Sequence, residues 1–116
     1  MIIVDFDKFI KMPEGTVYSF YNEQTFTGLY IKVDTISNTD WWYKELVVNP
    51  DSNFIDGYIT SFSELEKGNS VPIDTELLHR DGMFDYDREF AIYETEDIKQ
   101  LITELILNLK NYETSE

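Results

Sequence analysis

Three segments with strand character follow one another in the first half of the chain, separated by short polar turns. They are Thr16–Tyr21, Leu29–Ile36 and Trp41–Val48, all rich in β-branched and aromatic residues. In the second segment, LYIKVDTI, apolar and polar residues alternate with a period of two, as in a strand whose successive side chains point to opposite faces. Because strands joined by short connections pair antiparallel, these segments predict an antiparallel meander.

The spacing of the apolar residues becomes helical after the turn NPDS at residues 49–52. A helix is predicted over Asn53–Lys67, with Gly68 where a C-terminal cap is expected. A second helix is predicted over Thr95–Asn111, with Thr95 as its N-cap. Its apolar residues form one stripe, which we expect to pack on the sheet: Ile98, Leu101, Ile102, Leu105, Ile106 and Leu109.

A short helix and a fourth strand complete the expected elements. Asp5 is placed to cap a helical turn whose apolar residues share one face, namely Phe6, Phe9 and Ile10. Glu89–Tyr93 has strand character, whereas residues 74–88 are expected to be mostly irregular. The order predicts an α+β fold, with a mostly antiparallel sheet of four to five strands packed against two main helices, one of them C-terminal, plus the short N-terminal helix. A length of 116 residues fits a single domain over 1–116.

The net charge is −14 and is unevenly distributed. Residues 1–50 hold seven acidic and four basic side chains, a net of −3, whereas residues 51–116 hold sixteen and five, a net of −11. Such a field repels nucleic acid and anionic lipid and attracts basic protein surfaces. We therefore expect no direct binding to nucleic acid or membranes, and a basic protein, in particular a nucleic-acid-binding enzyme, as the partner.

Carboxylates are concentrated between residues 79 and 97, in the stretch HRDGMFDYDREFAIYETED. We interpret seven of them as the candidate partner-binding face, extended by Glu64 and Glu66: Asp81, Asp85, Asp87, Glu89, Glu94, Glu96 and Asp97. The calcium-loop pattern D-x-D-x-D-G is not met, because counting from Asp85 the third ligand position holds Glu89 and the required glycine is Phe90. The sequence therefore predicts no metal site and no cofactor.

The sequence contains no established catalytic motif that would identify an enzyme. There is no cysteine, which excludes thiolate catalysis, thiolate zinc sites and disulfides. His79 is the one histidine, and the sequence has no G-x-S-x-G elbow, no P-loop and no G-x-G-x-x-G loop. The triplet HRD at residues 79–81 matches the kinase catalytic loop in those letters alone, without its asparagine or a glycine-rich loop. We predict that the chain is not an enzyme.

The start of the chain, MIIVDFDKFIK, has an acidic residue at position 5 and lacks the basic start and apolar run of a signal peptide. No apolar run of about 18 residues, the length that spans a membrane, occurs in the sequence. Together with the absence of cysteine, these features predict a cytoplasmic protein.

Trp41 and Trp42 are adjacent in a predicted strand, so their side chains are expected to point to opposite faces of the sheet. Either both are covered by other elements, or one is an exposed aromatic anchor, since tryptophan is enriched among interface hot spots. Both are therefore retained as candidate partner-binding residues.

Several stretches of the chain resemble a known group of proteins: MPEGTVYS at 12–19, GLYIKVDTI at 28–36, DWWYKEL at 40–46, and RDGMFD with EFAIYETEDI between 80 and 98. They are similar to small acidic proteins encoded by phages, prophages and related mobile elements. The resemblance covers most of the chain but includes no catalytic motif, so it transfers no functional residue. It implies a phage-type origin, a setting in which small acidic inhibitors of host defence nucleases occur, including anti-CRISPR and DNA-mimic proteins.

The leading hypothesis is a non-enzymatic inhibitor that binds a basic, nucleic-acid-handling host protein through its acidic half. An immunity or antitoxin protein that neutralises a basic nuclease toxin would obey the same physics. Two further alternatives stay open: a metal-dependent hydrolase that uses Asp81, Asp85 and Asp87, and an accessory protein whose charge serves solubility alone.

Overall fold

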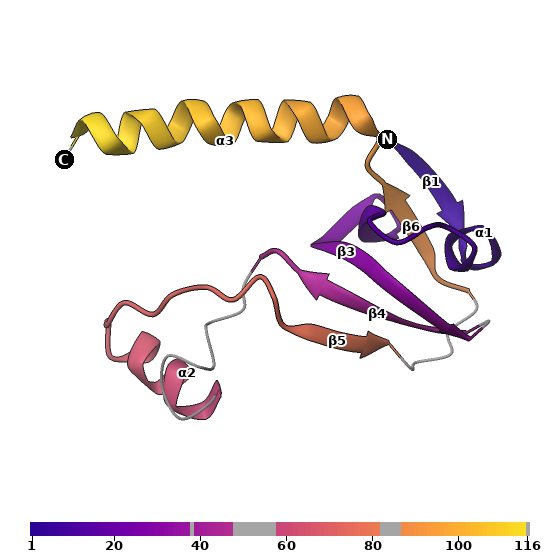
Figure 1. Cartoon of the computed structure of the whole chain (residues 1–116), viewed down its shortest axis with the longest axis horizontal. Helices are drawn as coiled ribbons and strands as arrows, with labels where there is room; N and C mark the ends of the chain where they lie inside the picture. Colours follow the sequence, from indigo (N-terminus) through magenta and orange to yellow (C-terminus); the bar gives the residue numbers. More distant parts are fainter. Residues whose placement is uncertain (38, 48–57, 82–86, 116) are drawn as a thin grey trace.

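The computed structural model describes residues 1–37, 39–47, 58–81 and 87–115, which form one antiparallel sheet with three helices (Figure 1). In chain order the elements are β1 (Ile2–Asp5), α1 (Phe6–Ile10), β2 (Val17–Asn22), β3 (Thr25–Ser37), β4 (Asp40–Glu45), α2 (Tyr58–Glu66), β5 (Leu78–Asp81), β6 (Glu89–Ile92) and α3 (Thr95–Ser115). The strands lie in the order β1-β6-β2-β3-β4-β5, and each neighbouring pair is antiparallel. The predicted α+β fold is confirmed.

The sheet of the described residues has six strands rather than four to five because strands are added at both edges. β1 pairs with β6, and β5 pairs with β4. The expectation that residues 74–88 are mostly irregular is wrong for β5, whose sequence LHRD has no β-branched residue and no clear alternation. An edge strand is held by backbone hydrogen bonds to a single neighbouring strand. Its side chains therefore need not alternate, and the sequence gives little sign of the strand. Two stretches lie outside the described residues: the start of the predicted helix Asn53–Lys67, and Val48 of the predicted third strand.

The core is aromatic and is built around the short helix α1. The Phe9 ring stacks on the Phe90 ring, with centroids 3.9 Å apart, and meets Tyr18 and Trp41 edge-on at 4.6 and 5.0 Å. The Trp41 indole Nε1 donates a hydrogen bond of 2.9 Å to the Tyr18 hydroxyl. The rings of Trp41 and Phe90 lie 5.8 Å apart, although two strands separate β4 from β6 in the sheet order. The sheet therefore curls around α1.

Lys32 is fully buried beside this aromatic core. Its ammonium donates hydrogen bonds to the carbonyl oxygens of Ile10 and Met12, at 2.9 and 2.6 Å, just after the end of α1. The last carbonyls of a helix have no helical donor, and a lysine commonly satisfies them. Burial lowers the pKa of the Lys32 ammonium. The alternation in β3 thus directs Lys32 and Tyr30 toward the core, while Leu29, Ile31 and Val33 on the opposite face stay partly exposed.

The long helix α3 does not lie on the sheet but extends away from it (Figure 1). Its apolar side chains are exposed, with Leu105 at 71% and Tyr112 at 72% of their full accessible area. The expectation that this stripe packs on the sheet is therefore wrong. The short helix α1 and the aromatic rings of the strands already fill the core, so helical periodicity identified an apolar face without identifying what covers it. In the parts of the chain described, no helix is both long and apolar enough to cross a membrane.

Candidate protein-interaction surfaces

The carboxylates of the predicted partner-binding face fall into two groups rather than one. The first group is Glu89, which begins β6, and Asp87, which lies two residues before it. Asp81 ends β5, an edge strand four positions from β6 in the sheet order, and belongs to neither group. Glu94 and the two acidic residues that follow it lie beyond the other end of β6. At about 3.4 Å per residue, the Cα atoms of Glu89 and Glu94 are about 17 Å apart, twice the screening length of about 8 Å at physiological salt. Asp85 lies outside the described residues.

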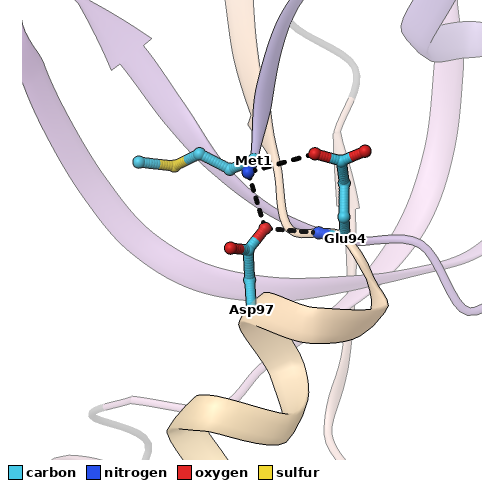
Figure 2. Close-up of polar contacts among 3 residues, drawn as sticks. All are labelled: Met1, Glu94 and Asp97. Atoms are coloured by element: carbon cyan, nitrogen blue, oxygen red, sulfur yellow. Dashed lines mark hydrogen bonds and ion pairs between the residues drawn. The ribbon is translucent and has the colours of Figure 1, made fainter.

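The second group surrounds the ammonium group of Met1, which lies 2.7 Å from Asp97 Oδ2 and 3.1 Å from Glu94 Oε1 (Figure 2). Asp97 Oδ2 also accepts the backbone N–H of Glu94 at 2.8 Å, and the carbonyl of Glu94 accepts the N–H of Ile98. A side chain three residues beyond the N-cap that returns to the N-cap amide is half of a capping box. Glu94 is therefore the N-cap of α3, and Thr95, predicted for that role, is its first helical residue.

The pKa values of these groups reflect the ion pairs between them. The hydrogen bond to Asp97, followed by the one to Glu94, raises the pKa of the Met1 ammonium above 8.0. The bond to that ammonium, followed by the bond to the Glu94 amide, lowers the pKa of the Asp97 carboxyl below 3.8. Glu96 in turn lies 3.3 Å from Lys99 one turn along the helix. The acidic residues at this end are thus engaged within the chain, where they join β1 to α3.

The first group borders a groove of about 400 Å³ beside the start of β6, lined by Phe20, Tyr21, Asn22, Asp87, Arg88 and Glu89. The guanidinium of Arg88 lies 4.8 Å from the centre of the Phe20 ring and 5.4 Å from that of Trp41. This is the distance range of cation–π contacts, so Arg88 is directed onto the aromatic core while the Asp87 and Glu89 residues on either side of it are exposed. The groove therefore has an acidic rim.

The two tryptophans differ in exposure. Trp41 is completely buried in the core, so its side chain offers no surface to a partner in this structure. Trp42 is partly exposed and, as the alternation predicted, lies on the opposite face of β4. Its backbone is paired with that of Arg80 in β5.

A half-buried ion pair between Asp40 and Arg80 was not predicted from the sequence. Asp40 is 2% exposed, and its Oδ2 lies 2.5 Å from Nε of Arg80 in the edge strand β5. The two residues are 40 positions apart and Asp40 is the last residue of a polar turn sequence, SNTD, so it reads as a turn former. The pair joins β4 to β5 and leaves Asp40 Oδ1 buried without a hydrogen-bond partner.

α3 carries more of the exposed large apolar side chains than any other described element, and six of them between residues 101 and 109 are exposed by 41 to 71%. Five of them lie along one stripe, namely Leu101, Ile102, Leu105, Ile106 and Leu109, whereas Leu107 lies on the opposite side of the helix. Where α3 leaves the sheet, a shallow apolar hollow of about 280 Å³ is lined by Met1, Tyr93, Leu101 and three polar residues of the helix. Contiguous exposed apolar surface is characteristic of protein-binding sites. The stripe was visible in the sequence, but it was assigned to the core.

Among the described residues, no group of three or more histidine or acidic side chains is arranged to hold a metal ion. His79 stacks on the Tyr43 ring with centroids 5.4 Å apart. Comparison with known proteins gives no guide to these surfaces: no family model matches the chain, and neither a curated protein nor a solved structure shows significant similarity to it.

Proposed function

We propose that this chain is a non-enzymatic binding protein that inhibits a basic, nucleic-acid-handling protein, in the manner of an anti-CRISPR or DNA-mimic inhibitor of phage or mobile-element origin. The observation that carries the proposal is that most of the few basic side chains contact other groups of the same chain. Of nine basic side chains, at least four form ion pairs with carboxylates, Lys32 is buried on backbone carbonyls and Arg88 is directed onto the aromatic core. With 23 acidic side chains against nine basic ones, the chain keeps a net charge of −14 and therefore a negative field.

The acidic rim at the start of β6 suits this role better than the Met1 end of the same strand. Glu89 is exposed and lies on β6, which is paired on both sides by β1 and β2, and Asp87 is exposed two residues before the strand. Carboxylates fixed on such an element can occupy a cleft that normally binds phosphates, and the field of the whole chain accelerates the encounter. Glu94 and Asp97 form ion pairs with the Met1 ammonium at the other end of the strand.

The test is affinity capture from a bacterial lysate with a C-terminally tagged protein, because a tag at the other end would disturb the Met1 ion pairs. We expect a basic nucleic-acid-binding protein that dissociates as salt rises from 50 to 500 mM and that duplex DNA displaces. Salt-insensitive binding of a partner with no affinity for nucleic acid would contradict the proposal.

The location of the binding face is tested with two double variants that change the net charge by the same amount. Asp87→Lys with Glu89→Lys should slow association at least about tenfold, since charges near an interface act mainly on the on-rate. Asp7→Lys with Asp34→Lys alters two exposed carboxylates on α1 and β3 and should have a much smaller effect. Equal slowing by both pairs would mean that only the total charge matters, and would remove the acidic rim as the site.

A further inference from the structure

The chain exposes more surface than a compact monomer of its mass. A globular protein of 13.7 kDa is expected to expose about 6,600 Å², whereas this chain exposes 8182 Å². The excess of about 1,600 Å² is twice the roughly 800 Å² that each partner buries in a stable interface. Because α3 carries more of the exposed large apolar side chains than any other described element, it is the element expected to be covered when that excess is buried.

The spacing along α3 is that of a helix that pairs with another helix. Five apolar residues follow one another at intervals of four, three, four and three, which places them at alternating d and a positions of a heptad repeat: Ile98, Ile102, Leu105, Leu109 and Tyr112. Four of the five are large side chains more than 49% exposed in the single chain, and Ile98 is partly buried. A sheet surface does not require this repeat, whereas the seam of a two-helix coiled coil does.

The charge distribution selects the orientation of such a pair. α3 holds four acidic and two basic side chains, a net of −2, so the rest of the chain carries −12 of the total of −14. We call the part of each chain outside α3 its body. Parallel pairing would bring the two bodies, each with a net charge of −12, side by side at one end of the helix pair. Antiparallel pairing places them at opposite ends of a helix of 21 residues, about 31 Å long and thus several screening lengths of about 8 Å.

We propose that two copies of this chain associate through antiparallel pairing of their α3 helices. In the proposed register Leu105 of one copy faces Leu109 of the other, and Ile102 then faces Tyr112. At the flanking e positions Lys99 of one copy lies beside Glu113 of the other, and symmetry repeats each of these contacts once. The apolar seam is thereby covered, and opposite charges face each other along its flanks. The proposal is independent of the proposed function, because the acidic rim at the start of β6 lies on the body and stays accessible in either state.

The oligomeric state is tested by sedimentation equilibrium of the full chain, where pairing gives a mass of 27.4 kDa, twice 13.7 kDa. We expect association to strengthen between 50 mM and 1 M NaCl, since salt screens the repulsion between the bodies and does not weaken an apolar seam. A basic partner would show the opposite salt dependence, so the two kinds of binding are distinguishable. A mass of 13.7 kDa at all salt concentrations and at 0.5 mM protein would overturn the proposal.

The face of α3 is tested with a matched pair of variants. Leu105→Glu places a carboxylate in the centre of the seam and should weaken association at least about a hundredfold. Leu107→Glu makes the same chemical change about 180° around the helix, at a side chain 51% exposed, and should leave the dimer intact. Both positions are exposed in the single chain, so loss of folding is not expected, and circular dichroism verifies it. If both variants stayed dimeric, or both became monomeric, α3 would not be the seam.

The orientation is tested with a nitroxide at Glu96→Cys, which is the one cysteine in that variant. Antiparallel pairing in the register given above is symmetric about residue 107, so the two labels lie 22 residues apart, about 33 Å along the helix axis. Parallel pairing would place them within about 20 Å of each other. Electron–electron distance measurement decides between these values, and the shorter one would overturn the antiparallel arrangement.

Discussion

At the scale of single residues, Lys32 is a buried cation whose charge is stabilised by backbone carbonyls. Its ammonium replaces the missing hydrogen-bond donors at the end of α1 and packs 5.3 Å from the centre of the Phe9 ring. The alternation in β3 placed Lys32 on the same face as Tyr30, but it did not indicate that this face was the core. The carbonyls that hold the ammonium are 20 and 22 residues earlier in the chain, and no side-chain pattern marks them.

Replacing Lys32 with methionine keeps most of the buried volume and leaves the carbonyls of Ile10 and Met12 without this donor. Because an unsatisfied buried polar group costs roughly 1–3 kcal/mol, we expect the free energy of unfolding to fall by about 2 kcal/mol. Urea denaturation measures the change, and Lys8→Met, at an exposed lysine of α1, is the control. Unchanged stability would mean that the cost of burying the ammonium equals the gain from its hydrogen bonds.

The Met1 cluster predicts a dependence of stability on pH at both ends of the range. Asp97 has a pKa lowered below 3.8, so its contribution is present above that pH and is lost as the pH falls through the folded-state value. The Met1 ammonium has a pKa raised above 8.0, so its contribution is complete below pH 8.0 and is lost as the pH rises through the folded-state value.

Thermal unfolding followed between pH 2 and pH 10 measures these two losses of stability, which form the acid limb and the alkaline limb of the curve of stability against pH. Acetylation of the amino terminus should remove the alkaline limb, because the acetylated nitrogen no longer titrates. Glu104→Gln, at an exposed position further along α3, should retain both limbs. An alkaline limb that survives acetylation would show that other groups produce it.

At the scale of elements, the helices show what periodicity reveals and what it leaves open. The three central strands, β6 and the position of α3 follow from side-chain patterns in the sequence. Which helix covers the sheet does not follow from these patterns. An amphipathic stripe can pack equally well on a sheet of the same chain and on another molecule. α1 has five residues and was expected to be a minor element. Nevertheless it fills the core, because Phe6 and Phe9 project from it into the curl of the sheet.

This difference between the helices is measurable by truncating one side chain on each. Phe9→Ala removes a ring that is completely buried and stacked, and should lower the free energy of unfolding by about 3–5 kcal/mol. Leu105→Ala, at 71% exposure, should lower it by less than about 0.5 kcal/mol at a protein concentration at which sedimentation gives the mass of a single copy. A large loss for Leu105→Ala in dilute solution would show that α3 packs on its own sheet.

At the scale of the whole molecule, the distribution of the carboxylates was only partly predictable. Their abundance between residues 79 and 97 is visible in the sequence, but an extended strand separates its two ends, so near neighbours such as Glu89 and Glu94 do not share a site. The contact between Met1 and Asp97 joins residues 96 positions apart, which no local pattern indicates. Charge counts therefore predicted the field of the molecule and not the grouping of its acidic residues.

The described carboxylates should bind divalent cations weakly, because the exposed acidic residues are dispersed and no group of three is arranged around one point. We expect calorimetric titration with Ca²⁺, Mg²⁺ and Mn²⁺ to show only diffuse heats that vanish at 0.5 M NaCl. The control is the Asp87→Lys, Glu89→Lys double variant, which should differ little. Stoichiometric binding at micromolar affinity would revive the hydrolase hypothesis.

The projection of α3 also affects how the chain migrates during purification. Its radius of gyration is 16.4 Å, with extents of 46 × 34 × 26 Å, whereas a compact chain of 116 residues has a radius of about 13 Å. A radius of 16.4 Å is that of a compact protein of about 200 residues. A single copy will therefore leave a gel-filtration column near the volume of a globular protein almost twice its mass, and an elution volume calibrated on globular standards will overstate the number of copies present.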